Sequence, residues 1–217
     1  LLFIDSLGFN WNGNNIFVSS IVFSKNGKKI LVETDKEKLW RYSFKATYFV
    51  LDLATKNLFP VSSRNKKLRN VKFSPNGKYV SYVRDDNNIY VFNTKSLKEK
   101  QLTRTGNNNV LNGHFGWLYE EELTGYDGYR WSPDSKYIAF WEENQSKVPE
   151  FSILDELKFY PAAKKIRYPK VGESNPSLRI GIARIEGAGK KWIKEAHVED
   201  DYLPWMEWIN EDKIAFM

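Results

Sequence analysis

Apolar and polar residues alternate over short stretches of this chain, with the period of two that is typical of β-strands. The pattern is clearest in residues 28–32, 78–83 and 136–141, each of which begins with Lys and continues with mainly apolar side chains. Two more strands are expected at residues 48–53 and 88–93. No stretch of useful length follows the helical period, so we expect an all-β protein.

The expected strands follow a repeated turn motif: an aromatic residue, Ser, a turn residue, Asn or Asp, a small residue and Lys. The copies are residues 23–28, 73–78 and 131–136, with a degenerate fourth at 208–213. Asn-Gly and Asp-Ser pairs tolerate positive φ and close tight hairpins. About four strands per repeat at this spacing are typical of a β-propeller blade. Because closed propellers have about four to eight blades, the sequence predicts an incomplete ring of roughly four.

The long gap between the third and fourth copies contains Pro149, Pro169 and Pro176. Proline disfavours both helix and central strand, so we expect residues 149–176 to form an extended crossing segment between strands. The chain begins without Met and ends in an expected strand, which predicts that residues 1–217 are a domain fragment of a longer protein.

Composition limits the classes of function. Of 217 residues, 41% are hydrophobic and 16% aromatic, which is enough for a sizeable core. The net charge of +6 is spread along the chain, and the densest basic segments, residues 64–69 and 164–167, are short. A nucleic-acid surface usually has a longer basic stripe with interleaved aromatics, so we expect turns and solvated edges here and no nucleic-acid partner.

Several kinds of chemistry lack the residues they need. The chain has no cysteine and no Gly-x-Ser-x-Gly motif, and only His114 and His197 could act as imidazole bases. The spacings typical of zinc, calcium or phosphate-binding loops are also missing from the sequence. We therefore expect no catalytic residue, metal or cofactor within this chain.

An acidic run at residues 120–122 is the strongest candidate site. Trp117, Tyr119 and Leu123 favour burial, so the three carboxylates are expected at the edge of a pocket, where they would attract a cation. The alternative is an acidic surface helix that caps a blade. Adjacent Glu side chains converge on one ligand only at a turn or a helix end, and Gly116 favours such an irregular insertion.

Arg41 lies between the aromatic residues Trp40 and Tyr42, after a repeat strand. A guanidinium held between aromatic rings is well suited to bind a carbonyl or a carboxylate. The alternative is a structural ion pair with a nearby acid.

These blocks resemble the N-terminal β-propeller domain of the dipeptidyl peptidase IV family, which are serine exopeptidases of the prolyl oligopeptidase clan. The resemblance covers nearly the whole chain, and its most specific block is Trp-x-Tyr-Glu-Glu-Glu. The matching segments occur in family order: residues 40–43, 112–113, 117–122, 131–134, 148–149, 168–172 and 175–176.

The resemblance implies a role for each feature of the candidate site. Glu121 and Glu122 would bind the free N-terminal ammonium of a peptide, Arg41 would contact a substrate backbone carbonyl, and Glu120 would be structural. With the amine anchored, only the bond two residues into the peptide reaches the nucleophile. The implied activity of the whole protein is the release of N-terminal dipeptides of the Xaa-Pro or Xaa-Ala type.

The resemblance also implies parts of the protein outside this chain. The catalytic triad of the family lies in a C-terminal α/β-hydrolase domain, which is absent here, so the chain alone is not expected to catalyse. The implied partners are the peptide N-terminus and that hydrolase domain, with a homodimer of the full-length protein as a further expectation. A periplasmic or exported location is favoured by the resemblance.

Two alternatives remain at this point. The first is a non-catalytic propeller scaffold, or a peptidase homologue that has lost its triad. The second is a relative of prolyl oligopeptidase or acylaminoacyl peptidase, which would keep the propeller but lack the ammonium site.

Overall fold

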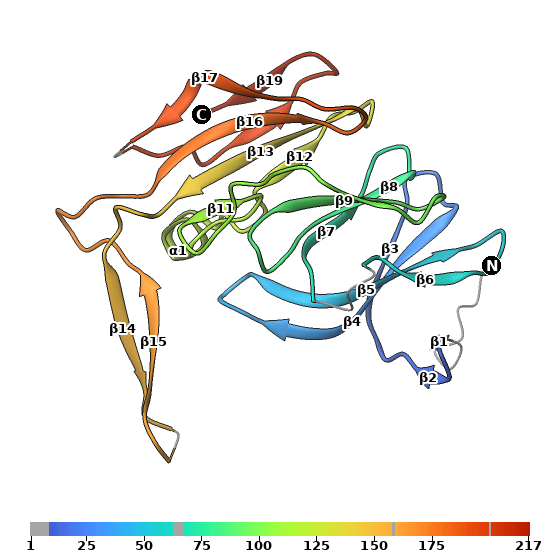
Figure 1. Ribbon diagram of the computed structural model, residues 1–217, viewed down its shortest axis with the longest axis horizontal. Coiled ribbons are helices and arrows are strands. Elements are labelled where there is room, and N and C mark those ends of the chain that lie inside the picture. Colours follow the sequence, from blue (N-terminus) through green and yellow to red (C-terminus); the bar gives the residue numbers. More distant parts are fainter. Residues whose placement is uncertain (1–8, 63–66, 158, 200) are drawn as a thin grey trace.

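The computed structural model describes residues 9–62, 67–157, 159–199 and 201–217, and these are almost entirely β-structure. The strands form antiparallel sheets that follow one another along the chain and are arranged side by side in space (Figure 1). This confirms the expected all-β fold, an incomplete β-propeller with one short helical insertion.

Two blades contain four strands each, and in both the strands pair in sequence order. The first consists of β3 (Val18–Phe23), β4 (Lys29–Lys38), β5 (Phe44–Asp52) and β6 (Leu58–Pro60). The second consists of β7 (Arg69–Phe73), β8 (Tyr79–Val83), β9 (Ile89–Asn93) and β10 (Glu99–Gln101). The strands predicted from alternation therefore lie where they were expected.

The third blade is five-stranded. The chain leaves this sheet after β13 and returns to it at β16, which pairs with β13. Its strands are β11 (Val110–Asn112), β12 (Tyr129–Trp131), β13 (Tyr137–Asn144), β16 (Ser177–Arg184) and β17 (Lys190–Val198). Three two-stranded pairs complete the described strands: β1 (Asn10–Trp11) with β2 (Asn14–Asn15), β14 (Glu150–Asp155) with β15 (Ala162–Arg167), and β18 (Met206–Trp208) with β19 (Ile214–Phe216).

The repeated Ser closes the hairpin turn of each blade, which explains why it recurs. The Oγ atoms of Ser24, Ser74 and Ser132 accept hydrogen bonds at 2.9–3.0 Å from the backbone N–H five residues later. Gly77 and Ser135 have φ of 69° and 64°, as the turn requires. The motif is therefore a local device for starting each second strand.

The hydrophobic cores lie between neighbouring sheets. One contains Leu31 and Tyr82 from the first and second blades, and another contains Val83 and Phe140 from the second and third. Trp141 belongs to a third cluster, which includes residues of the β18–β19 pair. This face-to-face burial of successive sheets holds the blades at fixed positions and so positions the loops between them.

Residues 149–176 were expected to form an extended crossing segment, and this prediction is wrong for residues 150–167. Residues 150–167 form the hairpin β14–β15, which projects from the rest of the molecule (Figure 1). Pro149 and Pro169 lie just outside the paired strands, so neither interrupts the ladder. The end of the hairpin is apolar and exposed, with Leu157 at 99% and Phe159 at 93% exposure.

The basic segments differ in part from the solvated edges that were expected. Residues 64–66 lie outside the described residues, and Lys67 forms ion pairs with Asp35 and Glu37. Arg69 is partly buried and contacts the ring of His114 at 3.2 Å, so the expectation is wrong for this residue. Residues 164–167 belong to β15.

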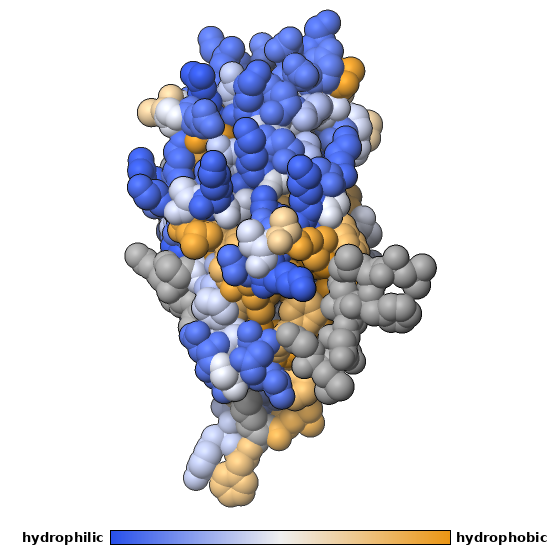
Figure 2. Space-filling view, turned by 90° about the vertical axis from the view of Figure 1, so that its right-hand side faces the viewer, coloured by the Kyte–Doolittle hydropathy of each residue, from blue (hydrophilic) through white to orange (hydrophobic). Residues whose placement is uncertain are grey.

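The face shown in Figure 2 is divided by polarity. Hydrophilic side chains cover its upper part, and hydrophobic side chains gather in its middle and lower parts. The described residues contain no helical segment with the length and hydrophobicity that a membrane span requires.

Candidate functional site

The acidic run lies in the short helix α1 (Trp117–Leu123), which is inserted between β11 and β12 (Figure 1). Gly116 caps its beginning in an extended conformation, and Thr124 ends it in the left-handed conformation with φ of 55°. Glu121 and Glu122 therefore lie in the last turn of a helix. This is the irregular insertion that the glycine residues indicated.

The helix is anchored to the third blade through Tyr119, which is 1% exposed. Its ring stacks on Phe115 at 5.1 Å, and its hydroxyl accepts a hydrogen bond from the backbone N–H of Leu203 at 2.9 Å. Burial raises the pKa of the Tyr119 hydroxyl, so it stays protonated at neutral pH. The packing of Tyr119 thus holds the helix, and with it the three Glu residues 120–122, in a fixed position.

Glu120 is buried and ties the helix to the loop between β4 and β5. One of its carboxylate oxygens accepts hydrogen bonds from the backbone N–H groups of Tyr42 at 2.8 Å and Ser43 at 2.7 Å. Hydrogen bonds from N–H groups to an ionised carboxylate are among the stronger ones in proteins. Glu120 therefore has a structural contact, and it fixes the loop that carries Arg41.

Arg41 and Glu121 form an ion pair across this loop and the helix, with 2.7 Å between Nε and Oε2. The Arg41 side chain is 64% exposed and that of Glu121 is 14% exposed. Glu122 is exposed, and within the described residues its carboxylate has no hydrogen bond or ion pair. The structure thus brings Arg41 and Glu121 into contact and leaves Glu122 facing solvent beside them.

The hairpin β14–β15 supports the same region from a second side. The Nζ atom of Lys164 lies 3.8 Å from the ring centre of Trp40, next to Arg41. The ring of Trp117 lies 4.5 Å from that of Tyr168, which also contacts Phe151 at 5.6 Å. The sequence analysis missed these contacts, although Trp40, Trp117 and Tyr168 all occur in segments that carried the family resemblance.

A buried carboxyl group lies beneath the start of helix α1. Glu143 on β13 is 0% exposed and accepts hydrogen bonds from the backbone N–H of Gly116 at 2.9 Å and from Nε2 of Gln145 at 2.5 Å. Burial raises its pKa to about 7, although both hydrogen bonds act in the opposite direction. Sequence analysis missed Glu143; the signal was two adjacent acids, Glu142 and Glu143, inside an apolar strand.

The two histidines have no geometry suited to general-base catalysis. His114 is buried, and desolvation together with the charge of Arg69 lowers its pKa to about 3. Its Nε2 atom lies 2.9 Å from Oδ1 of Asn87 and its Nδ1 atom contacts Arg69, which fits a neutral, structural ring. His197 is exposed on β17. Among the described residues, no group of three acidic or histidine side chains could hold a metal ion.

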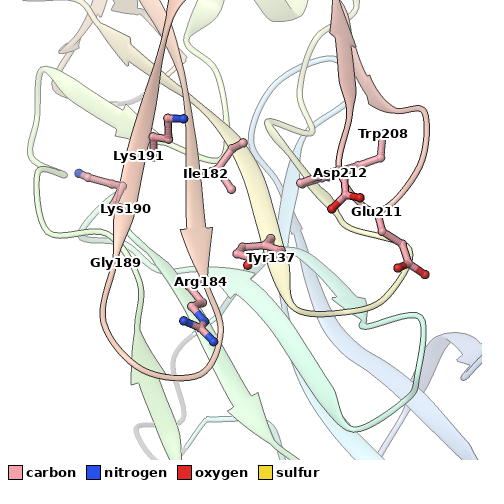
Figure 3. Close-up of a pocket in the computed structure, with 9 residues that line it drawn as sticks. All are labelled: Tyr137, Ile182, Arg184, Gly189, Lys190, Lys191, Trp208, Glu211 and Asp212. Carbon is pink, nitrogen blue, oxygen red and sulfur yellow. The ribbon is translucent and has the colours of Figure 1, made fainter.

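The cavity in Figure 3 is separate from the acidic helix. It has a volume of about 400 Å³ and lies between the β16–β17 hairpin and the turn that joins β18 to β19. Its charged side chains include Arg184 and Lys190 on one side and Glu211 and Asp212 on the other, and its lining does not include Arg41, Glu121 or Glu122.

Comparison with known proteins places this architecture in a family. The family model described as "Dipeptidyl peptidase IV (DPP IV) N-terminal region" matches residues 24–217. Over 99% of this chain, the sequence is 34% identical to a probable dipeptidyl-aminopeptidase B from Talaromyces stipitatus, of which it covers 26%. It is also 34% identical, over 80% of this chain, to dipeptidyl aminopeptidase B from Saccharomyces cerevisiae, of which it covers 22%. The chain thus spans about a quarter of the length of these relatives.

Solved structures agree with the sequence matches. The crystal structure of Porphyromonas gingivalis dipeptidyl peptidase 4 superposes with a TM-score of 0.86 at 32% identity, covering 92% of this chain and 29% of that one. A putative dipeptidyl aminopeptidase IV from Bacteroides ovatus, with a TM-score of 0.62 and 18% identity, shares the fold. These matches confirm the resemblance drawn from the motifs: the chain belongs to the dipeptidyl peptidase IV N-terminal region family.

Proposed function

We propose that this chain is the substrate-gating and N-terminus-recognising propeller region of a serine exopeptidase that releases N-terminal dipeptides of the Xaa-Pro or Xaa-Ala type. The relatives are named dipeptidyl aminopeptidases, which supports a peptidase as the whole protein. Catalysis is assigned to a C-terminal hydrolase domain outside this chain. A homodimer of the full-length protein stays a prediction.

The observation that carries the proposal is the arrangement of Arg41, Glu121 and Glu122. Two adjacent carboxylates lie in the last turn of a helix, and only one of them is neutralised by a contact with Arg41. A peptide ammonium near Glu122 would supply the second positive charge. An α-amine has an ordinary pKa of about 7.7–8.0, and neighbouring carboxylates favour its charged form at neutral pH.

The same geometry explains how a peptide would be oriented. The guanidinium of Arg41 is 64% exposed and has donors besides the Nε that contacts Glu121, so it can also donate to a substrate carbonyl. Glu120 and Tyr119 hold the loop and the helix rigidly, so the distance between the amine site and the carbonyl site is fixed. When the amine is held at a fixed position, only a peptide bond at one distance from it is aligned with the nucleophile. Misplacement of that bond by about 1 Å would already slow catalysis strongly.

The test uses the full-length protein with chromogenic Xaa-Pro and Xaa-Ala substrates that carry a free amine. We expect Glu121→Gln and Glu122→Gln each to reduce kcat/KM at least about tenfold, mainly through KM, which corresponds to a loss of about 1.4 kcal/mol. Glu195→Gln, at an exposed Glu on β17, is the matched control and should leave both constants unchanged. Unchanged kinetics in both site variants would overturn the ammonium site.

The alternatives give different results in the same experiment. A full-length protein that hydrolyses none of these substrates would support a non-catalytic scaffold or a homologue without its triad. A protein that cleaves N-acetylated substrates as well as free ones would support a relative of prolyl oligopeptidase or acylaminoacyl peptidase.

A further inference from the structure

Glu143 is a buried acid without a basic partner among the described residues. On β13 it lies opposite Leu111 of β11 and Leu178 of β16. Within the part of the chain that the structure describes, its carboxyl group forms hydrogen bonds only with the side chain of Gln145 and the backbone of Gly116. Burial of a carboxylate without a cation is unfavourable. An apolar side chain could occupy this buried strand position without the cost of burying a carboxyl group. The presence of Glu143 here is therefore best explained by its contact with Gly116.

Gly116 is the N-cap of helix α1, and glycine has no side chain with which to cap it. Oε2 of Glu143, on β13, accepts the N–H of Gly116 itself at 2.9 Å. The fit is close, because a Cβ atom added at Gly116 would lie 1.6 Å from Nε2 of Gln145 and 2.8 Å from Oε1 of Glu143. The third blade therefore holds the N-cap residue of the helix against Glu143.

We propose that Glu143 is a positioning residue for the ammonium site: by binding Gly116 it fixes the start of helix α1, whose last turn presents Glu121 and Glu122. Tyr119 and Leu203 hold the middle of the helix, and Glu120 holds the loop of Arg41. Glu143 supplies a polar anchor at the helix start, beside the ring contact of Trp117 with Tyr168. This inference rests on the proposed function, because it assigns a task to the site described there.

The charge of Glu143 changes near neutral pH, which gives the inference a distinctive signature. Its pKa is about 7, because burial disfavours the anionic form more than the hydrogen bonds from Gln145 and Gly116 favour it. The groups that face it are the apolar Leu111 and Leu178, neutral Gln145, the Gly116 backbone and Tyr119, with Asp201 and Tyr202 beyond Tyr119. None of these is a cation, so ionisation of Glu143 leaves an uncompensated buried charge, and the helix start is held less firmly above pH 7 than below it.

The experiment compares the full-length wild-type protein with Glu143→Gln at pH 6 and pH 8, using a dipeptide substrate with a free amine. The ratio of the variant KM to the wild-type KM should fall from about 1 at pH 6 to about 0.2 at pH 8, because ionisation of the buried Glu143 loosens the helix start in the wild type and the neutral Gln has no such ionisation. The kcat ratio should stay within about twofold. Titration of the substrate amine is common to both proteins and cancels in the ratio.

A KM ratio that is equal at pH 6 and pH 8 would overturn the inference, because a merely structural role would change the stability and not this ratio. Glu143→Asp keeps the charge but withdraws it by one methylene, and should raise KM at both pH values. An unchanged KM in Glu143→Asp would also overturn it, and this variant keeps the test decisive if Glu143→Gln does not fold.

Failure of this inference can be distinguished from failure of the proposed function. If Glu121→Gln and Glu122→Gln leave KM unchanged, the proposed function itself fails. If they raise KM and the KM ratio of Glu143→Gln to wild type is the same at both pH values, only this inference fails.

Discussion

Replacement of Glu120 by Ala tests whether the three acids of the run have different tasks. In the structure Glu120 binds the protein itself, whereas Glu122 faces solvent. We expect Glu120→Ala to destabilise the protein strongly and Glu122→Ala hardly at all. The local sequence pattern gives no reason for such a difference, because the two residues are chemically identical and two positions apart; only the family resemblance distinguishes them.

The magnitude follows from the two N–H groups that lose their acceptor. A buried donor left without a partner costs about 1–3 kcal/mol. Ser43 is buried, so loss of the acceptor for its N–H has the full cost. Tyr42 is 41% exposed, so water partly replaces the bond to its N–H. The expected loss is about 2–4 kcal/mol. Glu120→Gln keeps an oxygen in the same place and should lose only the charge assistance, about 1 kcal/mol.

Denaturant unfolding of the full-length variants measures these differences, with tryptophan fluorescence as the signal. Glu122→Ala is the control and should change the free energy of unfolding by less than about 0.5 kcal/mol, as is usual for a surface substitution. Glu120→Ala should also raise KM for dipeptide substrates, because the loop of Arg41 is released. If Glu120→Ala were no more destabilising than Glu122→Ala, the assignment of Glu120 as the anchor of this loop would be refuted.

Two further predictions concern the start of helix α1. Gly116→Ala should destabilise the protein by roughly 1–3 kcal/mol, because the new Cβ displaces the Gln145 amide from Glu143, whereas Gly125→Ala, with its nearest contact at 3.4 Å, should be close to neutral in the same unfolding assay. Because burial raises the pKa of Glu143 from 4.5 to about 7, its contribution to stability falls as pH rises from 4.5 to 7. The free energy of unfolding of the wild type relative to Glu143→Gln should therefore decrease by about 3 kcal/mol between pH 4.5 and pH 8, and a constant difference in pH-dependent unfolding would contradict the buried carboxyl.

The fold was accessible from sequence because its signals are local. In each hairpin the Ser, the turn residues and the following strand lie within a few positions of one another, and the Ser24 Oγ contact spans only five residues. The hairpin β14–β15 is not predicted by the sequence, because proline disfavours a central strand, whereas the prolines here lie at the ends of the paired segments. Local composition does not reveal which residues of a Pro-containing segment find a partner strand.

The candidate site was accessible only in part, because its contacts are between distant residues. The hydrogen bond from Ser43 to Glu120 joins residues 77 positions apart, and the bond from Gly116 to Glu143 joins residues 27 positions apart. Burial of Glu120 and Glu143 depends on these pairings and cannot be read from their neighbours in the sequence. The separate roles of Glu120, Glu121 and Glu122 came from the family resemblance, and the structure adds the contact that distinguishes Glu120.

The central claim is that Glu121 and Glu122 bind a peptide amine, and a crystal structure of the full-length protein with a bound peptide tests it most directly. The peptide should have Pro in second position and a reduced, non-cleavable bond after it. We predict that its amine nitrogen lies within about 3 Å of carboxylate oxygens of both Glu121 and Glu122, with Arg41 donating to a backbone carbonyl of the peptide. An amine that faces solvent, or that is bound by other residues, would contradict the account.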